Sequence, residues 1–160
     1  MDFETTTAYC KICRGDVERS ADVITDLADA PGRIAAALDA SPAHGANGWS
    51  PPEVAAHLAD MEVFRGWRIR RTLAEDTPTI ESLDEETWAA ALRYADRDPS
   101  MSLATFEINR RSNLELLSLA GESALNRTWH DARKGPLTLG DLVNHTSDHD
   151  LAHLRQVMGT

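Results

Sequence analysis

Three of the six histidines occur at four-residue intervals near the C-terminus, at His145, His149 and His153. Residues four apart share one face of an α-helix, so two imidazoles at this spacing can bind a single metal ion. One ion cannot bind all three, because His145 and His153 would lie roughly 12 Å apart along the helix axis. The row therefore offers either His145 with His149 or His149 with His153. A helical projection favours the second pair, which lies at the centre of the face around Leu142.

A possible third ligand, His57, lies far upstream in another helical segment, on the side that carries Val54, Leu58 and Met61. Two ligands from one helix and one from another would form a three-coordinate metal site with an open position. The same spacing also fits ordinary core histidines. The remaining histidines, His44 and His130, are predicted to lie in solvent-exposed loops.

Cys10 and Cys13 are the only cysteines, and they form a C-x-x-C motif. A structural zinc site normally needs four ligands, and the sequence has no second cysteine pair. A thioredoxin-like redox motif would need a parallel sheet, which nothing in the sequence indicates. We therefore expect two reduced thiols at the surface. The alternative is half of a zinc site, completed by a histidine or a second subunit.

The formal net charge of −10 argues against nucleic acid or an anionic membrane as the main partner. The sequence has no apolar run of transmembrane length, and its polar start lacks the features of a signal peptide, so we expect a cytoplasmic protein. The arginines are expected on solvated helix faces: Arg68, Arg70, Arg71, Arg110 and Arg111.

The elements that would position these residues are almost all helical. Residues 1–15 are predicted to be an irregular arm that carries the C-x-x-C motif, and residues 16–160 a single domain. Strand-like alternation is almost absent, so the sequence predicts an all-α four-helix bundle with a short extra helix. The expected helices cover residues 16–40, kinked or divided at Pro31, then 50–73, 83–94 and 99–120, and finally 138 nearly to the C-terminus, with loops at 41–48 and 122–137.

The helix that carries His57 has the clearest start. Ser50 occupies the N-cap position, Pro51 follows at the first helical position, and Glu53 completes a capping box. Thr138 and Asp141 form a similar pair before the last helix.

Two motifs resemble those of DinB-like proteins. Residues 49–58, WSPPEVAAHL, followed by Glu62, are similar to the second-helix signature of that family. Residues 149–157, HDLAHLRQV, are similar to its closing H-D-x-x-H-L-x-Q motif, and the turn at 135–139 also fits. The resemblance covers about residues 20–158. It implies a four-helix bundle of up-down-down-up type, often a homodimer, with a divalent metal at one end.

The resemblance implies that His57, His149 and His153 are the metal ligands, with His145 near the site or lining a cleft. The family includes thiol S-transferases that use bacillithiol or mycothiol, and a mycothiol-dependent maleylpyruvate isomerase. It therefore implies an enzyme that activates a thiol or water, with a small-molecule substrate and a low-molecular-weight thiol as co-substrate. Zn²⁺ is the preferred ion, and Ni²⁺ or other divalent ions stay open.

The catalytic candidates are Asp60 and Glu62, which share a helix with His57, and His145. Asp148 and Asp150 are expected to be surface charges, with orientation of the closing histidine pair or action as a base as the alternative, and Trp67, Trp88 and Trp129 to be pocket walls or core. The alternative function is a non-catalytic metal-binding or stress-response bundle that acts through a protein partner. In that case the last helix would offer a dimer face made of Val143, Leu151, Leu154 and Met158.

Overall fold

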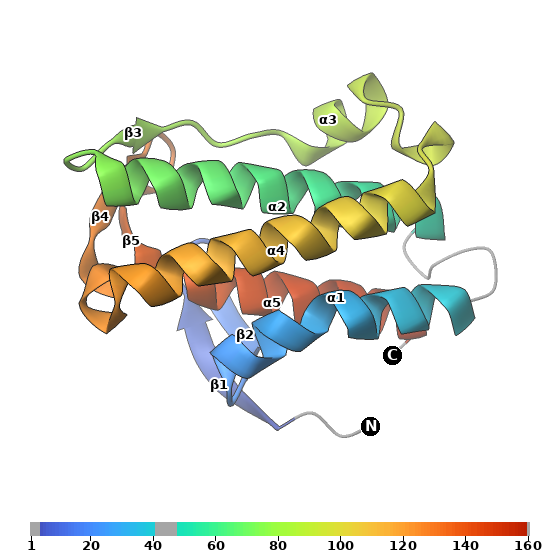
Figure 1. Ribbon diagram of the computed structural model, residues 1–160, viewed down its shortest axis with the longest axis horizontal. Helices are drawn as coiled ribbons and strands as arrows, with labels where there is room; N and C mark the ends of the chain where they lie inside the picture. Colours follow the sequence, from blue (N-terminus) through green and yellow to red (C-terminus); the bar gives the residue numbers. More distant parts are fainter. Residues whose placement is uncertain (1–3, 41–47, 160) are drawn as a thin grey trace.

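A computed structural model describes residues 4–40 and 48–159. Four long helices form a bundle: α1 (Val23–Ala40), α2 (Pro51–Ala74), α4 (Pro99–Ala120) and α5 (Leu139–Met158). The chain colours in Figure 1 show that α1 and α5 run in one direction and α2 and α4 in the other. Helix α1 packs against α5 and α4, and α2 packs against α4 and α5. The predicted four-helix bundle of up-down-down-up type is confirmed.

The helix ends follow the sequence signals closely. The backbone N–H of Ser50 donates to Glu53 Oε2 at 2.7 Å, which forms one half of the predicted capping box. At the start of α5, the N–H of Asp141 donates to Thr138 Oγ1 at 3.0 Å, and the N–H of Thr138 donates to Asp141 Oδ2 at 2.9 Å. Helix α1 continues through Pro31 without being divided. The predicted loop at 41–48, with His44, lies outside the described residues except for Gly48.

Helices α2 and α4 are parallel, so the chain between them must return along the bundle (Figure 1). This connection contains β3 (Thr79–Ile80), the short helix α3 (Glu85–Ala91) and the 3₁₀ turn η1 (Tyr94–Asp96). The predicted extra helix at 83–94 is therefore present in a shorter form.

The prediction of an irregular N-terminal arm was wrong. Strand β1 (Thr5–Cys10) pairs antiparallel with β2 (Gly15–Ser20), and α1 begins only at Val23. The hairpin packs against α5, where Arg19 and Asp148 form an ion pair at 3.2 Å. Of its strand residues only Cys10 and Ser20 are buried, so the strands lack the alternating apolar pattern that burial of one whole face imposes.

A small sheet lies at one end of the bundle (Figure 1). Strand β4 (Thr128–Asp131) pairs parallel with β3 and antiparallel with β5 (Gly135–Thr138), and the 3₁₀ turn η2 (Glu122–Asn126) precedes it. The prediction of a loop over residues 122–137 was therefore wrong where these strands lie. The strands are too short to show a periodic pattern in the sequence. The sheet helps to bury Trp129 completely, together with Ile80 and Leu137.

The dimer face predicted on the last helix is not free. Val143, Leu151 and Leu154 are buried within the chain, and only Met158 is exposed. This face therefore does not provide a dimer interface, and the homodimer stays a prediction.

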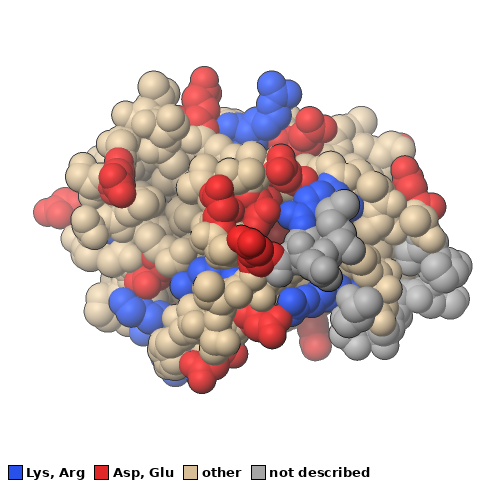
Figure 2. All heavy atoms as spheres, turned by 90° about the horizontal axis from the view of Figure 1, so that it is seen from below, with Lys and Arg blue, Asp and Glu red and all other residues tan. Residues whose placement is uncertain are grey.

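No helix in the described part of the chain is long and apolar enough to cross a membrane. Figure 2 shows acidic side chains spread over one face, with lysine and arginine side chains between them rather than in one large patch. This distribution agrees with the negative net charge.

Candidate metal site

Three histidines from two helices meet inside the bundle. His57 lies on α2, and His149 and His153 lie on successive turns of α5. The Nε2 atoms of His57 and His149 are 2.9 Å apart, and the His153 ring centroid is 4.8 Å from that of His57 and 4.5 Å from that of His149. One ring nitrogen from each residue lies within 4.8 Å of the other two, so the group could hold a metal ion. The structure thus brings together the three residues predicted as ligands.

Burial keeps these imidazoles neutral. It lowers the pKa of His57 to about 3, with His153 and Arg65 adding to the effect. Burial also lowers the pKa of His149 and of His153. A neutral imidazole has a free lone pair on one nitrogen, which is the form that binds a metal.

The hydrogen bonds around the rings suit a cation. His153 Nδ1 lies 2.8 Å from Gln156 Oε1. The amide oxygen can only accept, so Nδ1 carries the proton and Nε2 keeps its lone pair. The Nδ1 atoms of His57 and His149 are buried and have no hydrogen-bond partner among the described residues. Three ring nitrogens that lie within 4.8 Å of one another fit a divalent ion such as zinc.

Aromatic rings cover one side of His57. The Trp49 ring packs edge-on against it with centroids 5.0 Å apart, and Tyr94 lies 6.5 Å from it. Sequence reasoning missed both contacts, although Trp49 directly precedes the capping Ser50. The tryptophans proposed as pocket walls lie elsewhere: Trp129 is in the core, Trp67 is 55% exposed, and Trp88 packs on Phe64.

The candidate base Asp60 is bound by an arginine. Arg97 Nη1 donates to both carboxylate oxygens of Asp60 at 2.8 Å. Burial and the nearby Asp60 carboxylate raise the pKa of Tyr94. Asp60 is therefore part of an ion pair that supports the aromatic side of the site.

The second candidate, Glu62, belongs to a buried ionic network. Arg110 donates to Glu62 Oε2 at 2.8 Å and to Asp150 Oδ2 at 2.7 Å, and Asn113 donates to Glu62 Oε1 at 2.9 Å. Arg65 Nη1 lies 3.7 Å from Glu62. Burial alone would raise the pKa of Glu62, but the charge and hydrogen bond of Arg110 outweigh it, so the pKa is lowered.

The prediction of surface charges was wrong for Arg110, Asp148 and Asp150. Arg110 is 1% exposed, and both Asp148 and Asp150 are buried. The sequence showed only charged residues at helical spacing. A buried charge that pairs with another helix cannot be told from a surface charge by spacing alone.

The third candidate, His145, lies next to the cysteines. Its Nδ1 is 3.6 Å from Cys10 Sγ and 3.4 Å from Cys13 Sγ, whereas its ring centroid is 6.1 Å from that of His149. Burial and the charge of Arg65 lower its pKa to about 3. The prediction of two surface thiols is right for Cys13, which is exposed, and wrong for Cys10, which is buried.

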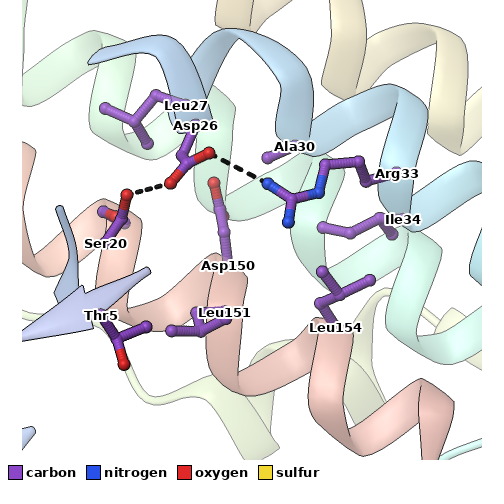
Figure 3. Close-up of a pocket in the computed structure, with 11 residues that line it drawn as sticks. Thr5, Ser20, Asp26, Leu27, Ala30, Arg33, Ile34, Asp150, Leu151 and Leu154 are labelled. Atoms are coloured by element: carbon purple, nitrogen blue, oxygen red, sulfur yellow. Dashed lines mark hydrogen bonds and ion pairs between the residues drawn. The ribbon is translucent and has the colours of Figure 1, made fainter. Parts of the chain in front are cut away.

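A pocket lies between α1, α5 and the N-terminal hairpin (Figure 3). Leu151 and Leu154 line it from α5, and at 100° per residue these two face away from His149 and His153. Across this pocket Asp26 pairs with both Ser20 and Arg33. The pocket is thus separate from the three-histidine group.

Known proteins are similar to this chain in both sequence and fold. The YfiT protein of Bacillus subtilis is 32% identical over 115 residues, which are 69% of this chain and 64% of YfiT. The OB0782 protein of Oceanobacillus iheyensis is 27% identical over 120 residues, covering 75% of this chain and 68% of that protein. Both carry the name metal-dependent hydrolase. The chain thus spans just under two thirds of the length of YfiT.

The solved structure of YfiT, a four-helix bundle of unusual topology, superimposes with a TM-score of 0.78 at 24% identity. The match covers 86% of this chain and 82% of the other. At that identity the likeness establishes the fold. Residues 18–157 match the sequence model of the DinB superfamily, and the chain belongs to that superfamily.

Proposed function

We propose that the protein is a metal-dependent enzyme whose divalent ion, Zn²⁺ by preference, is held by His57, His149 and His153. The observation that carries this proposal is the convergence of three neutral imidazoles from α2 and α5, of which His57 is buried and His149 and His153 are partly buried. The metal-dependent names of the relatives support the same conclusion.

A divalent ion with three protein ligands supplies a Lewis acid that lowers the pKa of a thiol or water, and so provides a nucleophile at neutral pH. The chain's own residues prepare the site for it. Gln156 fixes the tautomer of His153, and Trp49 and Tyr94 shield one side of His57 from water. Arg65 adds a positive charge that keeps the imidazoles unprotonated.

A thiol nucleophile, as in S-transfer or thiol-assisted isomerisation, fits this site best. Asp60 and Glu62 are both held by arginines, so neither is free to act as a general base. A thiol has a pKa of about 8.5 and ionises readily beside a metal without such a base. Hydrolysis by water is the second candidate function, because the relatives' names assign it to them.

Elemental analysis of purified protein tests the metal. His153→Ala should lose one equivalent of metal per chain relative to wild type. The matched control is His130→Ala, because His130 is exposed on β4 and lies outside the group. Full retention of metal in His153→Ala would refute the proposed ligand set.

Activity assays test the nucleophile. Metal-loaded wild type would be incubated with mycothiol, bacillithiol or glutathione and a panel of electrophiles, and separately with ester and amide substrates. We expect thiol-dependent turnover that His153→Ala abolishes. Turnover of esters or amides without a thiol would favour hydrolysis, and no turnover in either assay would favour a non-catalytic bundle.

A further inference from the structure

The turn of the N-terminal hairpin brings the C-x-x-C motif against α5. Cys10 ends β1, Cys13 lies in the turn, and His145 faces both from the second turn of α5. The distances from His145 Nδ1 are 3.6 Å to Cys10 Sγ and 3.4 Å to Cys13 Sγ. All three ligand atoms lie within 4.8 Å of one another. Residues separated by more than 130 positions thus present two sulfurs and a nitrogen to one point.

The turn is folded around the Cys10 sulfur. The backbone N–H of Cys13 donates to Cys10 Sγ at 3.2 Å, and the N–H of Arg14 donates to Cys10 O at 2.7 Å. Arg14 has φ = 58°, a left-handed conformation that a side chain adopts only at a cost. Burial and the neighbouring Cys10 raise the pKa of the Cys13 thiol, so an ion must displace its proton on binding.

The protein itself holds this turn against α5. Cys10 and Ile12 are buried in the cluster that contains Trp129 and Leu142. At the other end of the hairpin, Arg155 pairs with Glu18 at 2.6 Å. The sulfurs are therefore positioned by packing and ion pairs, so that an ion would meet a site that is already assembled.

We propose that Cys10, Cys13 and His145 form a second metal site, separate from the three-histidine group, that binds Zn²⁺. Two thiolates and one imidazole are typical zinc ligands, and thiolates disfavour harder ions such as Mg²⁺. On binding, the two thiols release their protons to solvent and no electron is transferred. Cys13 is exposed, so the fourth position is open to water.

The site ties the hairpin to the helix that carries His149 and His153. His145 precedes His149 by one helical turn, with ring centroids 6.1 Å apart, but the two groups share no residue. An ion at the second site would fix the hairpin turn to α5 beside the three-histidine group.

Cobalt titration distinguishes the two sites, because only a sulfur ligand gives a thiolate-to-Co²⁺ charge-transfer band. Reduced, metal-free, full-length protein would be titrated with Co²⁺. We expect the band in wild type and in His153→Ala, and its loss in Cys13→Ser and in His145→Ala. Lys11→Ala, an exposed change in the same turn, is the control and should keep the band.

Zinc measurements complete the test. Elemental analysis should show one equivalent fewer in Cys13→Ser than in wild type, and X-ray absorption should show sulfur at about 2.3 Å from zinc. Cys13→Ser changes an exposed residue, and His145→Ala repeats the test if the serine variant does not fold. A wild type without the charge-transfer band, a band that survives in folded Cys13→Ser, or a zinc-free Cys10–Cys13 disulfide would each overturn the proposal.

Discussion

Replacing Glu62 with glutamine tests whether this residue is structural or catalytic. Its side chain is 2% exposed and accepts hydrogen bonds from Arg110 at 2.8 Å and from Asn113 at 2.9 Å. Glu62→Gln keeps the shape of the side chain but removes its charge. The Arg110 guanidinium then has Asp150 as its remaining charged partner.

The expected loss follows from the burial of the pair. Removing one partner of a buried ion pair costs about 3–5 kcal/mol, because the other charge is left uncompensated. Glutamine still offers one carbonyl oxygen as acceptor, so we expect a loss of about 3 kcal/mol in the free energy of unfolding. For a domain of this size that corresponds to a fall in Tm of roughly 6–12 °C.

The effect should depend on pH with a defined sign. The pKa of Glu62 is lowered in the folded state from its usual value of about 4.3 in an unfolded chain. Its ionisation therefore stabilises the fold fully above about pH 4.3, and this stabilisation disappears as the pH falls through the lower folded-state pKa. The difference between wild type and Glu62→Gln should be constant near neutral pH and shrink in acid.

Urea denaturation followed by circular dichroism, at pH 7 and at a series of acidic values, measures this difference. Glu75→Gln is the matched control, because Glu75 pairs with Arg71 at the exposed end of the same helix, and little change is expected. Unchanged stability of Glu62→Gln together with a large loss of activity would refute the structural role and restore Glu62 as a catalytic base.

Two further substitutions test the site and the bundle. Gln156→Ala removes the acceptor of His153 Nδ1 and should weaken metal binding about 10–100-fold in a chelator competition assay; unchanged affinity would contradict the orienting role. Gly66→Ala would place a Cβ 2.6 Å from Asn113 Oδ1, where α2 meets α4. The cost of overpacking, about 1–3 kcal/mol, should exceed the gain in helix propensity of up to about 1 kcal/mol, so we expect a lower Tm. Gly32→Ala is the control: its Cβ would have no atom within 4 Å, so this variant should have a higher Tm. Equal changes in the Tm of the two variants would show that packing at Gly66 is not tight.

Sequence alone determined the four long helices and most of their ends. Local signals at Ser50 and Thr138 act within one helical turn, so they can be recognised without knowledge of the fold. Apolar spacing on long helices is equally local, and it predicted the bundle. The row of histidines on the last helix was visible for the same reason.

Tertiary structure decided which partners these residues meet. The hairpin could not be predicted, because its strands carry no alternating apolar pattern and their contacts with α5 come from a distant part of the sequence. Helical spacing left His145 as a possible partner of His149, and only the position of the hairpin turn brings it to Cys10 and Cys13. Likewise, Glu62 looked available as a base until Arg110 was found to reach it from α4. Such pairings depend on contacts between segments far apart in the chain, and the spacing of residues within a segment carries no information about them.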